Sequence, residues 1–351
     1  MDRFQIVETS GDLQHAGTKA TADIACIAAE LGFNRLCVRM NTTRDGVAAK
    51  FQRQWGYLKD WNGCYGQIGD GAVVLLQHPF HYPQLTRERI LRKLKYKKHV
   101  RFICLVHDVE KLRAFRYNSY YRHEADVMLE LADTLIVHNQ VMLDYFKMLG
   151  VSEERLVSLE IFDYLRDEAG AVAPGFAREI NVAGNLDAGK CGYLAKLGSL
   201  DGVMVNLFGP DFDMRMSRSK NIIYHGSFPP SEIPDRLTAG FGLVWDGDSV
   251  DGCKGAAGQY LCYNNPHKLS LYLASGIPVI IWAGAAEASF VTEHKVGICV
   301  NSLCELTDIL GRMTKEQYGE YAEAVRAVRG RLTEGYYTRR AIGRALDIVE
   351  R

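Results

Sequence analysis

Lys268 occupies a position where a positive charge needs an explanation. In the stretch YNNPHKLSLYLASGIPVII, residues 263–281, Pro266 fits the first helical position after an asparagine cap, and Gly276 fits the helix end. Lys268 then falls in the first helical turn, where the helix dipole disfavours a cation. Backbone N–H groups, the dipole and the lysine together suit a bound diphosphate. The alternative is a solvated lysine beside an asparagine cap.

A second candidate for ligand contact is the loop AGNLDAGK, residues 183–190, which follows an apolar run. Gly184 allows a ligand to approach the backbone closely, and Asn185 and Lys190 offer polar contacts. The loop has neither P-loop nor GxGxxG spacing, so an ordinary strand-to-helix turn is the alternative.

The segment FICLVHDVEKLRAF, residues 102–115, ends an apolar run in His107, Asp108, Glu110 and Arg113. Titratable groups at the carboxyl end of a strand tend to face a ligand cleft. A carboxylate there can act as general base on an acceptor hydroxyl, with Asp108 the first candidate and Glu110 the second. The alternative is a structural turn held by ion pairs.

Two further loops carry weaker signals. The stretch HAGTKATADIA, residues 15–25, places Gly17 and Thr18 at a helix start, where they suit a phosphate or an acceptor as well as an ordinary cap. The run DGDSVDG, residues 246–252, resembles an acidic metal-binding motif. We interpret it instead as a loop that brings Asp246 near a sugar, and we predict no metal site.

The segment RERILRKLKYKKHVR, residues 87–101, contains eight Lys or Arg residues and one Glu. Ile90, Leu91 and Leu94 form an apolar stripe, so the pattern is that of a basic amphipathic helix. Such a helix can lie on anionic lipid. A solvated helix preceding a core strand is the alternative.

The composition describes an ordinary globular protein. The chain has 351 residues, 47% hydrophobic and 24% charged, with formal net charge +0, which argues against a nucleic-acid partner. The start of the sequence has no apolar signal region, and no apolar run reaches the roughly 20 residues that span a bilayer. The nine cysteines form no CxxC pair, which favours reduced core residues in the cytoplasm.

Short apolar runs alternate with helical patterns along the whole chain, which predicts parallel sheets covered on both faces. The Ala-, Gly- and Pro-rich stretch 166–178 is the predicted linker. We predict an N-terminal domain over 1–170 and a C-terminal domain over 171–334, with a helix at about 335–351 packing back on the first. The strands are expected near 3–7, 35–40, 72–77, 100–107, 134–138 and 156–161, then near 179–184, 203–208, 221–225, 241–245, 278–282 and 297–300.

With these residues in view, the chain resembles bacterial glycosyltransferases of the GT-B architecture, in which two Rossmann-like α/β domains face each other across a cleft. It resembles the β-1,6-galactofuranosyltransferases of surface-polysaccharide clusters and, more distantly, the glucosyltransferases that extend O-linked glycans on serine-rich adhesins. The resemblance rests on HDVEKLR, AGNL, YHGSFPPSEIP, GFGLVWDGDS and the long stretch that begins YNNPHKLSLYLASGIPVII.

The resemblance implies a UDP-sugar donor as co-substrate, held by the second domain, with no cofactor and no metal. It places donor contacts on Asn265 and Lys268, with Thr18 contributed by the first domain. The implied reaction is an inverting displacement onto a glycan acceptor, which a lipid could carry. The complete set of predicted donor contacts is Gly17, Thr18, Asn185, Lys190, Phe228, Asp246, Asn264, Asn265 and Lys268. The predicted acceptor-side residues are His107, Arg113 and His78.

Two alternatives stay open at this point. The donor could be UDP-glucose and the acceptor a glycoprotein glycan, or the chain could be a transferase-like binding subunit without catalysis. The oligomeric state is open, and a homo-oligomer is compatible with the sequence. We expect a cytoplasmic protein that contacts the inner face of the membrane through residues 87–101.

Overall fold

The computed structural model describes residues 1–9, 16–42, 44, 46–80, 82–113, 117–166 and 174–351. The chain forms two compact units. Unit 1 comprises Met1–Leu112, Arg116–Leu159 and Thr338–Arg351, and unit 2 comprises Glu160–Tyr337 with Arg113–Phe115. The division after Leu159 precedes the boundary at 170 expected from the sequence. Of the predicted linker, residues 167–173 lie outside the described residues, and the second sheet already begins at Gly175.

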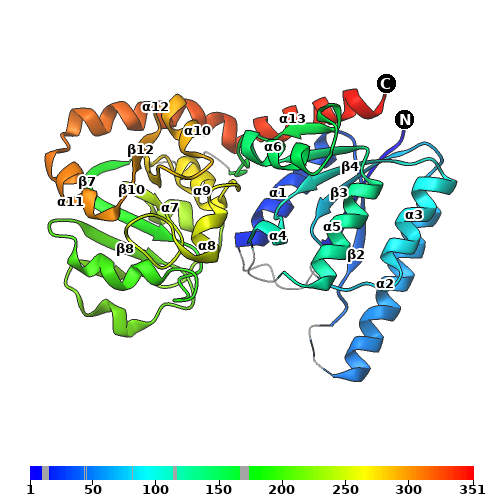
Figure 1. Cartoon of the computed structure of the whole chain (residues 1–351), viewed down its shortest axis with the longest axis horizontal. Helices are drawn as coiled ribbons and strands as arrows, with labels where there is room; N and C mark the ends of the chain where they lie inside the picture. The colour runs from blue at the N-terminus through cyan, green and yellow to red at the C-terminus, as the bar shows by residue number, and fades with distance from the viewer. Residues whose placement is uncertain (10–15, 43, 45, 81, 114–116, 167–173) are drawn as a thin grey trace. The chain divides into compact units, whose positions relative to one another are not determined.

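Unit 1 is built on a six-stranded parallel sheet with strand order β2-β1-β3-β4-β5-β6. Its strands are β1 (Arg3–Thr9), β2 (Asn34–Arg39), β3 (Val73–His78), β4 (Arg101–Val106), β5 (Thr134–Val137) and β6 (Leu156–Ser158). Its helices are α1 (Ala16–Glu30), α2 (Val47–Gln67), α3 (Arg87–Lys97), α4 (Glu110–Arg113), α5 (Ser119–Leu131) and α6 (Gln140–Met148), with the short η1 (Glu153–Arg155). Figure 1 shows α2, α3 and α5 grouped together on one side of this sheet.

The central strands of unit 1 form because their sequences are apolar on both faces. The side chains of VVLL in β3, FICLV in β4 and TLIV in β5 are all buried, as expected for a parallel sheet that helices cover on both sides. Each of the six strands expected from the sequence is present, with ends that differ by a few residues. The strand pattern was therefore predicted correctly in this unit.

The apolar stripe predicted for α3 faces the interior. Ile90, Leu91 and Leu94 are buried in the core of unit 1, together with Arg87. The expectation that these residues could lie on lipid was therefore wrong, because the helix uses its apolar side to cover the sheet. The helix lies ahead of the core strand β4, as the alternative has it, and membrane contact through its polar side stays a prediction.

Unit 2 contains a second six-stranded parallel sheet, with strand order β12-β11-β10-β7-β8-β9. Its strands are β7 (Gly175–Ala183), β8 (Met204–Phe208), β9 (Ile222–Tyr224), β10 (Ala239–Val244), β11 (Val279–Trp282) and β12 (Gly297–Val300). Its helices are α7 (Ile233–Arg236), α8 (Gly255–Tyr260), α9 (His267–Ser275), α10 (Ala288–Glu293), α11 (Leu306–Arg312) and α12 (Lys315–Thr333), with η2 (Gly192–Ser199), η3 (Met214–Arg218) and η4 (Leu303–Glu305). Read from β9, the order is that of a Rossmann sheet, whose direction of winding reverses between β7 and β10.

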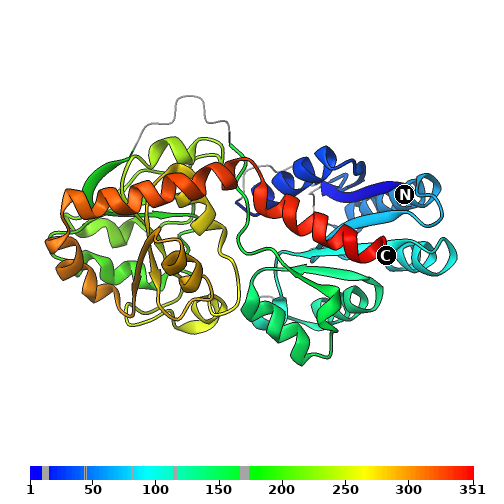
Figure 2. The same cartoon turned by 90° about the horizontal axis from the view of Figure 1, so that it is seen from above.

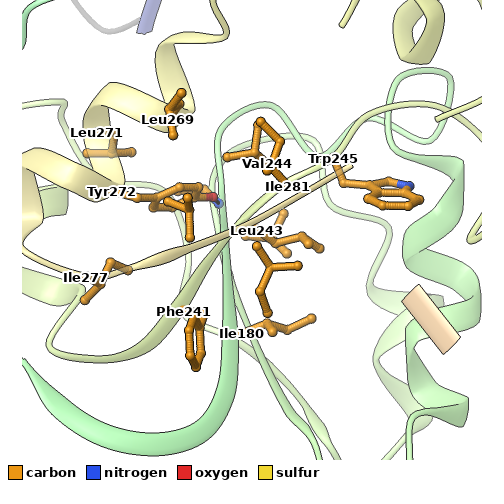
Figure 3. Close-up of a cluster of buried hydrophobic side chains, with 14 of the residues drawn as sticks. Ile180, Phe241, Leu243, Val244, Trp245, Leu269, Leu271, Tyr272, Ile277 and Ile281 are labelled. Carbon is orange, nitrogen blue, oxygen red and sulfur yellow. Dashed lines mark hydrogen bonds between the residues drawn. The ribbon is translucent and has the colours of Figure 1, made fainter. Parts of the chain in front are cut away.

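Helix α9 packs directly on β10 in the core of unit 2. A Cβ atom at Gly242 would lie 2.1 Å from the ring of Tyr272, so only glycine allows this close approach. The Tyr272 hydroxyl accepts a hydrogen bond from the backbone N–H of Ala183 at 2.8 Å. Figure 3 shows Tyr272 facing Phe241 and Leu243 across this interface. The contact fixes the start of α9 relative to the carboxyl ends of β7 and β10.

The start of α9 differs by one residue from the expectation. Pro266 occupies the N-cap position, without a side-chain capping hydrogen bond, and His267 is the first helical residue. The Asn265 side chain, predicted to cap the helix, donates instead to the carbonyl of Glu160 at 3.0 Å. Lys268 is in the first turn as predicted, and Gly276 ends the helix in the left-handed conformation, at φ 89°.

The C-terminal helices connect the two units along the chain. Helix α12 belongs to unit 2 and begins with a capping box formed by Thr314 and Gln317. Helix α13 (Tyr336–Val349) runs along unit 1 (Figure 2), where Arg339 pairs with Glu30 of α1 and Glu350 pairs with Arg3 of β1.

Candidate active site

In unit 2, four of the predicted donor residues lie at the carboxyl ends of β7 and β10. This is the point where the strand order reverses, and in open α/β sheets ligands bind there. The loop after β7 carries Asn185 and Lys190, the loop after β10 carries Asp246, and the first turn of α9 carries Lys268. The two loops are joined by a hydrogen bond from the Gly247 N–H to the Lys190 carbonyl at 2.8 Å.

Lys268 and Asp246 form a buried ion pair. Lys268 Nζ donates to Asp246 Oδ1 at 2.8 Å and to the Trp245 carbonyl at 2.9 Å. The two side chains are only 11% and 9% exposed, respectively. Because an ammonium group has three N–H donors, these two bonds leave one for a ligand oxygen.

Burial shapes the protonation of the groups around this pair. Burial alone would lower the pKa of Lys268, but the charge and hydrogen bond of Asp246, together with the nearby Cys191 and Tyr272, raise the pKa above the ordinary lysine value. Burial also raises the pKa of the Cys191 thiol to about 11 and that of the Tyr272 hydroxyl to about 12. At neutral pH the site therefore holds a permanently charged lysine between neutral Cys191 and Tyr272.

The loop after β7 is held in shape by its own polar groups. Asn185 Nδ2 donates to Asp211 Oδ2 at 3.0 Å, and Asn185 Oδ1 accepts from the Asp187 N–H at 2.7 Å. Gly184 has φ 131°, and its carbonyl lies where a Cβ of Gly209 would be. The Asn185 side chain is exposed and Lys190 is half-buried. Both stay available to a ligand above the sheet edge.

The other predicted donor residues of unit 2, Phe228, Asn264 and Asn265, differ in burial and in the contacts that they make. Phe228 is half-buried between Phe208, with ring centroids 6.4 Å apart, and the guanidinium of Arg236, 4.6 Å from its ring. Asn265 is buried and engaged with Glu160, as described above. Asn264 is half-buried, and its Oδ1 atom is buried and accepts no hydrogen bond from the described residues.

In unit 1, the predicted catalytic residues follow β4. Asp108 is half-buried in the turn between β4 and α4, whereas Glu110, the first residue of α4, is buried. His107 Nε2 makes a 2.7 Å hydrogen bond with Gln77 Oε1, which orients the ring beside the end of β3. Arg113 is the last residue of α4 and is half-buried. A general base must reach the substrate hydroxyl. Asp108 is more accessible than the buried Glu110, so Asp108 is the better candidate for this role.

His78 lies deeper than an acceptor contact requires. Its side chain is buried and lines an internal cavity of about 20 Å³ together with Arg87 and Glu124. That volume holds about one water molecule and not a sugar. A direct contact between His78 and an acceptor is therefore not supported by this structure.

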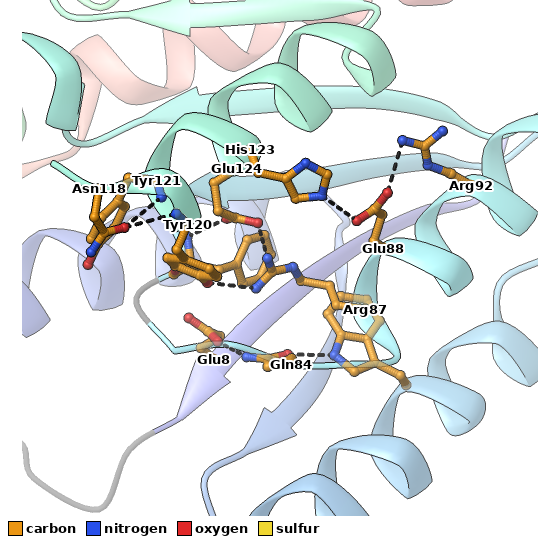
Figure 4. Close-up of polar contacts among 12 residues, drawn as sticks. Glu8, Gln84, Arg87, Glu88, Arg92, Asn118, Tyr120, Tyr121, His123 and Glu124 are labelled. Carbon is orange, nitrogen blue, oxygen red and sulfur yellow. Dashed lines mark hydrogen bonds and ion pairs between the residues drawn. The ribbon is translucent and has the colours of Figure 1, made fainter.

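A buried polar network supports this region of unit 1 (Figure 4). Arg87 pairs with Glu124, which also accepts a hydrogen bond from the Phe80 N–H at 3.3 Å. Gln84 accepts a hydrogen bond from Trp61 Nε1 at 2.6 Å and donates to Glu8 at the end of β1. Because each of these contacts joins segments distant in the sequence, the network fixes the loop after β3 against its neighbours.

Two residues that the sequence analysis did not single out lie at the same sheet edge. Glu8 is the next-to-last residue of β1. It lies next to the point where the strand order of unit 1 reverses between β1 and β3. His138 follows β5 and is buried, which lowers the pKa of its imidazole to about 4. The repeated pattern of an apolar strand ending in Val-His, at 106–107 and again at 137–138, could have identified His138.

The predicted contacts at the start of α1 are only partly described. Gly17 and Thr18 are in the first turn of α1, as expected, but their side chains lie outside what the structure describes. Within the described part of the chain, no group of three or more His, Cys, Asp or Glu side chains could hold a metal ion.

Two family models match the sequence. The model described as glucosyltransferase 3-like, N-terminal domain, matches residues 3–161, and the model described as glucosyltransferase 3-like, C-terminal domain, matches residues 180–345. The matches correspond closely to the two sheets of the structure.

Two curated relatives extend this finding. The chain is 33% identical over 252 residues to β-1,6-galactofuranosyltransferase WbbI of Escherichia coli K12, covering 70% of this chain and 72% of the relative. It is 26% identical over 324 residues to glucosyltransferase 3 of Streptococcus gordonii, covering 92% of each chain.

Solved structures of glycosyltransferases share the fold. Anabaena Alr3699/HepE in complex with UDP and glucose superposes with a TM-score of 0.62 at 11% identity, covering 99% of both chains. WaaG, a glycosyltransferase involved in lipopolysaccharide biosynthesis, superposes with a TM-score of 0.56 at 16% identity, covering 98% of both chains. The GT-B fold expected from the sequence is confirmed.

Proposed function

The chain belongs to the glucosyltransferase 3-like family and is a glycosyltransferase, and from that premise we propose that it transfers galactofuranose from UDP-galactofuranose to a glycan acceptor. The observation that supports this donor is the 33% identity to the E. coli β-1,6-galactofuranosyltransferase. The acceptor is proposed to be a surface polysaccharide under synthesis, and its carrier a lipid. No cofactor or metal is part of the proposal.

Unit 2 is proposed to hold the UDP moiety at the carboxyl ends of β7 and β10. The third N–H of Lys268 and the positive end of the α9 helix dipole are suited to a diphosphate oxygen. Asn185 and Lys190 are proposed to contact the donor from the loop after β7. Asn264 Oδ1, which lacks a hydrogen-bond donor among the described residues, is a candidate acceptor for a donor hydroxyl.

The proposed chemistry is an inverting displacement. Asp108 takes the proton of the acceptor hydroxyl, the hydroxyl oxygen forms a bond to the anomeric carbon, and the bond from that carbon to the UDP oxygen breaks. UDP leaves as an anion, and Lys268 and the amides of α9 stabilise its charge. Glu110 is the second candidate for the base, and its burial makes it the less accessible of the two carboxylates.

The decisive experiment combines a donor screen with a base variant. The protein is assayed with UDP-galactofuranose, UDP-glucose and UDP-galactose, and Asp108→Asn is compared with Glu110→Gln. We expect transfer from UDP-galactofuranose, a loss of about a hundredfold or more in kcat for Asp108→Asn, and nearly unchanged UDP binding. Normal turnover by Asp108→Asn would contradict the base assignment, and transfer from UDP-glucose alone would contradict the donor.

A second candidate function is glucosyl transfer from UDP-glucose to an O-linked glycan of a glycoprotein. It is supported by the 26% identity to the streptococcal glucosyltransferase 3, which extends over 92% of both chains. The same screen separates the two candidates, because only the sugar of the accepted donor differs.

For the location of the protein, we propose the cytoplasm with contact at the inner face of the membrane. Within the described ranges, no helix is both long and apolar enough to cross a bilayer. Membrane contact is therefore proposed to be peripheral.

A further inference from the structure

Helix α2 carries a row of large apolar side chains that the protein does not cover. Val47, Phe51 and Trp55 are 80%, 77% and 71% exposed. Their spacing of four residues places them on one face of the helix, and they are called the α2 stripe here. Three such side chains in one row expose far more contiguous apolar surface than scattered surface residues do.

The α2 stripe is not needed for the core of unit 1. The opposite face of the helix already packs inward through Tyr57, Trp61 and Cys64, all of which are buried. Figure 1 shows the first turns of α2 extending beyond the rest of this unit. The stripe is therefore presented outward at a protruding position.

The apolar surface continues from α2 onto the loop before α3. Gln54, next to Trp55, accepts a hydrogen bond from the Leu85 N–H at 3.0 Å and donates to the Pro83 carbonyl at 2.8 Å. These bonds hold Leu85, which is 81% exposed, beside the α2 stripe. Leu85 also lines a shallow hollow along the outer side of α3.

That hollow is strongly basic. Besides Leu85 and Tyr96 it is lined by four cations and one carboxylate. The cations are Arg89, Arg92, Lys93 and Lys97, which are called the α3 basic face here. The carboxylate, Glu88, is engaged by Arg92 at 2.9 Å and by His123 at 2.7 Å. The face therefore keeps a net positive charge next to the apolar stripe.

We propose that the α2 stripe and the α3 basic face together form a docking surface for an anionic lipid bilayer. The stripe inserts its side chains among the lipid headgroups, and the basic face lies against the phosphates. Apolar insertion and electrostatic attraction are the two contributions that stable peripheral attachment requires. The inference rests on the peripheral membrane contact of the proposed function and assigns it to a surface of unit 1, and it does not depend on which donor the enzyme uses.

Charge favours a lipid surface over a second copy of the chain as the occupant. A symmetric contact through this surface would place the basic faces of two copies close together, and like charges repel. An anionic bilayer instead complements the basic face.

The test is co-sedimentation of the full chain with vesicles, either of phosphatidylcholine alone or with added phosphatidylglycerol. We expect binding only to the anionic vesicles, weaker at high salt. Phe51→Ser/Trp55→Ser and Arg89→Glu/Lys93→Glu should each lower the partition coefficient by roughly tenfold or more. Exposed residues elsewhere supply matched controls, Met148→Ser/Met214→Ser and Lys196→Glu/Lys315→Glu, which should bind like the original protein.

Trp55 also reports insertion directly. Of the four tryptophans, Trp61 and Trp245 are fully buried and Trp282 is half-buried against the core of unit 2, so Trp55, 71% exposed, dominates a fluorescence change at this surface. We expect a blue shift and protection from iodide quenching on addition of anionic vesicles. Trp55→Phe should lose this signal and still sediment with the vesicles.

Three results would overturn the proposal. These are equal binding by the stripe variant and the original protein, equal binding to neutral and anionic vesicles, and an oligomer that Phe51→Ser/Trp55→Ser converts to a monomer in sedimentation velocity without any vesicle binding. The last result would assign the surface to a second copy. Thermal unfolding of each variant verifies that it is folded, so lost binding cannot reflect lost structure.

Discussion

At the scale of single residues, the contact between Lys268 and Asp246 changes the explanation for the positive charge at the start of α9. The sequence indicated a cation in the first turn of a helix and suggested a bound anion as the reason. The structure supplies an internal anion, because Asp246 accepts a 2.8 Å hydrogen bond from Lys268. The buried pair has one role in positioning the loop after β10, and the remaining N–H of Lys268 is what the proposed diphosphate contact requires.

The two roles of Lys268 can be separated by a double variant. Lys268→Ala should weaken UDP binding by about 10- to 100-fold, the value of a charge-assisted hydrogen bond. It should also destabilise unit 2 by about 3 kcal/mol, because the buried Asp246 carboxylate loses its partner. Both effects can be measured by titration calorimetry and denaturant unfolding.

Lys268→Ala/Asp246→Ala is the matched control for this prediction. Removing both charges should restore most of the stability while UDP binding stays weak, because the ligand still lacks the ammonium group. If the double variant recovered UDP binding together with stability, Lys268 would act only by holding Asp246.

His138 should make the stability of unit 1 sensitive to acid. Burial lowers the pKa of His138 to about 4 in the folded chain, whereas an unfolded histidine has a pKa near 6.5. Unfolding below pH 6.5 therefore takes up a proton, and stability falls as the pH drops from about 6.5 towards 4. The loss from this residue should reach about 2 kcal/mol at pH 5.

Denaturant unfolding between pH 7 and pH 5 checks this prediction. His138→Asn should flatten the pH dependence by about that amount, whereas His99→Asn, at an exposed position, should leave it unchanged. An unchanged slope in His138→Asn would show that other groups carry the acid sensitivity.

At the scale of elements, the strands and the end of α9 at Gly276 were predictable, and the start of α9 was not. The twelve strands of the described residues lie where apolar runs of four to eight residues indicated them, since a fully buried parallel strand needs little beyond continuous hydrophobicity. The start of α9 was displaced by one residue, because Asn265 donates to Glu160, more than a hundred positions away in the sequence. A cap prediction from local sequence has no access to such a partner.

The same limit applies to the faces of the helices. In α3 the apolar stripe was recognised, but sequence alone did not show that the sheet covers it. In α2 the exposed row of Val47, Phe51 and Trp55 was not recognised, because its sequence gives no sign of which side meets the core. Periodicity identifies an apolar face, and only the tertiary structure shows whether protein covers it.

In the candidate site, too, the positions of the loops could be predicted from the sequence, whereas the contacts between distant residues could not. Asn185 and Lys190 follow β7 and Asp246 follows β10, and the Rossmann-like strand order of unit 2 brings these two loops to one edge. Parallel strands place their carboxyl ends together, so the sequence could predict that these loops meet, and their contact with a donor stays a prediction. The pairing of Asp246 with Lys268 and the burial of His78 depend on packing, which the sequence pattern does not contain.

At the scale of the whole molecule, the C-terminal helix ties the end of the chain to unit 1. The first unit is made of three stretches of sequence, and its last stretch, Thr338–Arg351, follows the whole of Glu160–Tyr337 in unit 2. Ile342 of α13 is fully buried, as is Ala345. The folding of unit 1 therefore depends on residues that follow unit 2 in the sequence.

This dependence predicts that a core change in α13 acts on unit 1 selectively. Ile342→Ala should destabilise unit 1 by about 3 kcal/mol, the usual cost of truncating a buried isoleucine, and should leave unit 2 unaffected. Hydrogen exchange measured on peptides from β1 to β6 should accelerate, while peptides from β7 to β12 keep their protection. Arg344→Ala, exposed on the same helix, is the control and should change neither set. Equal acceleration in both sheets would mean that the two units unfold as one cooperative body, and that α13 stabilises the whole chain rather than the unit to which it returns.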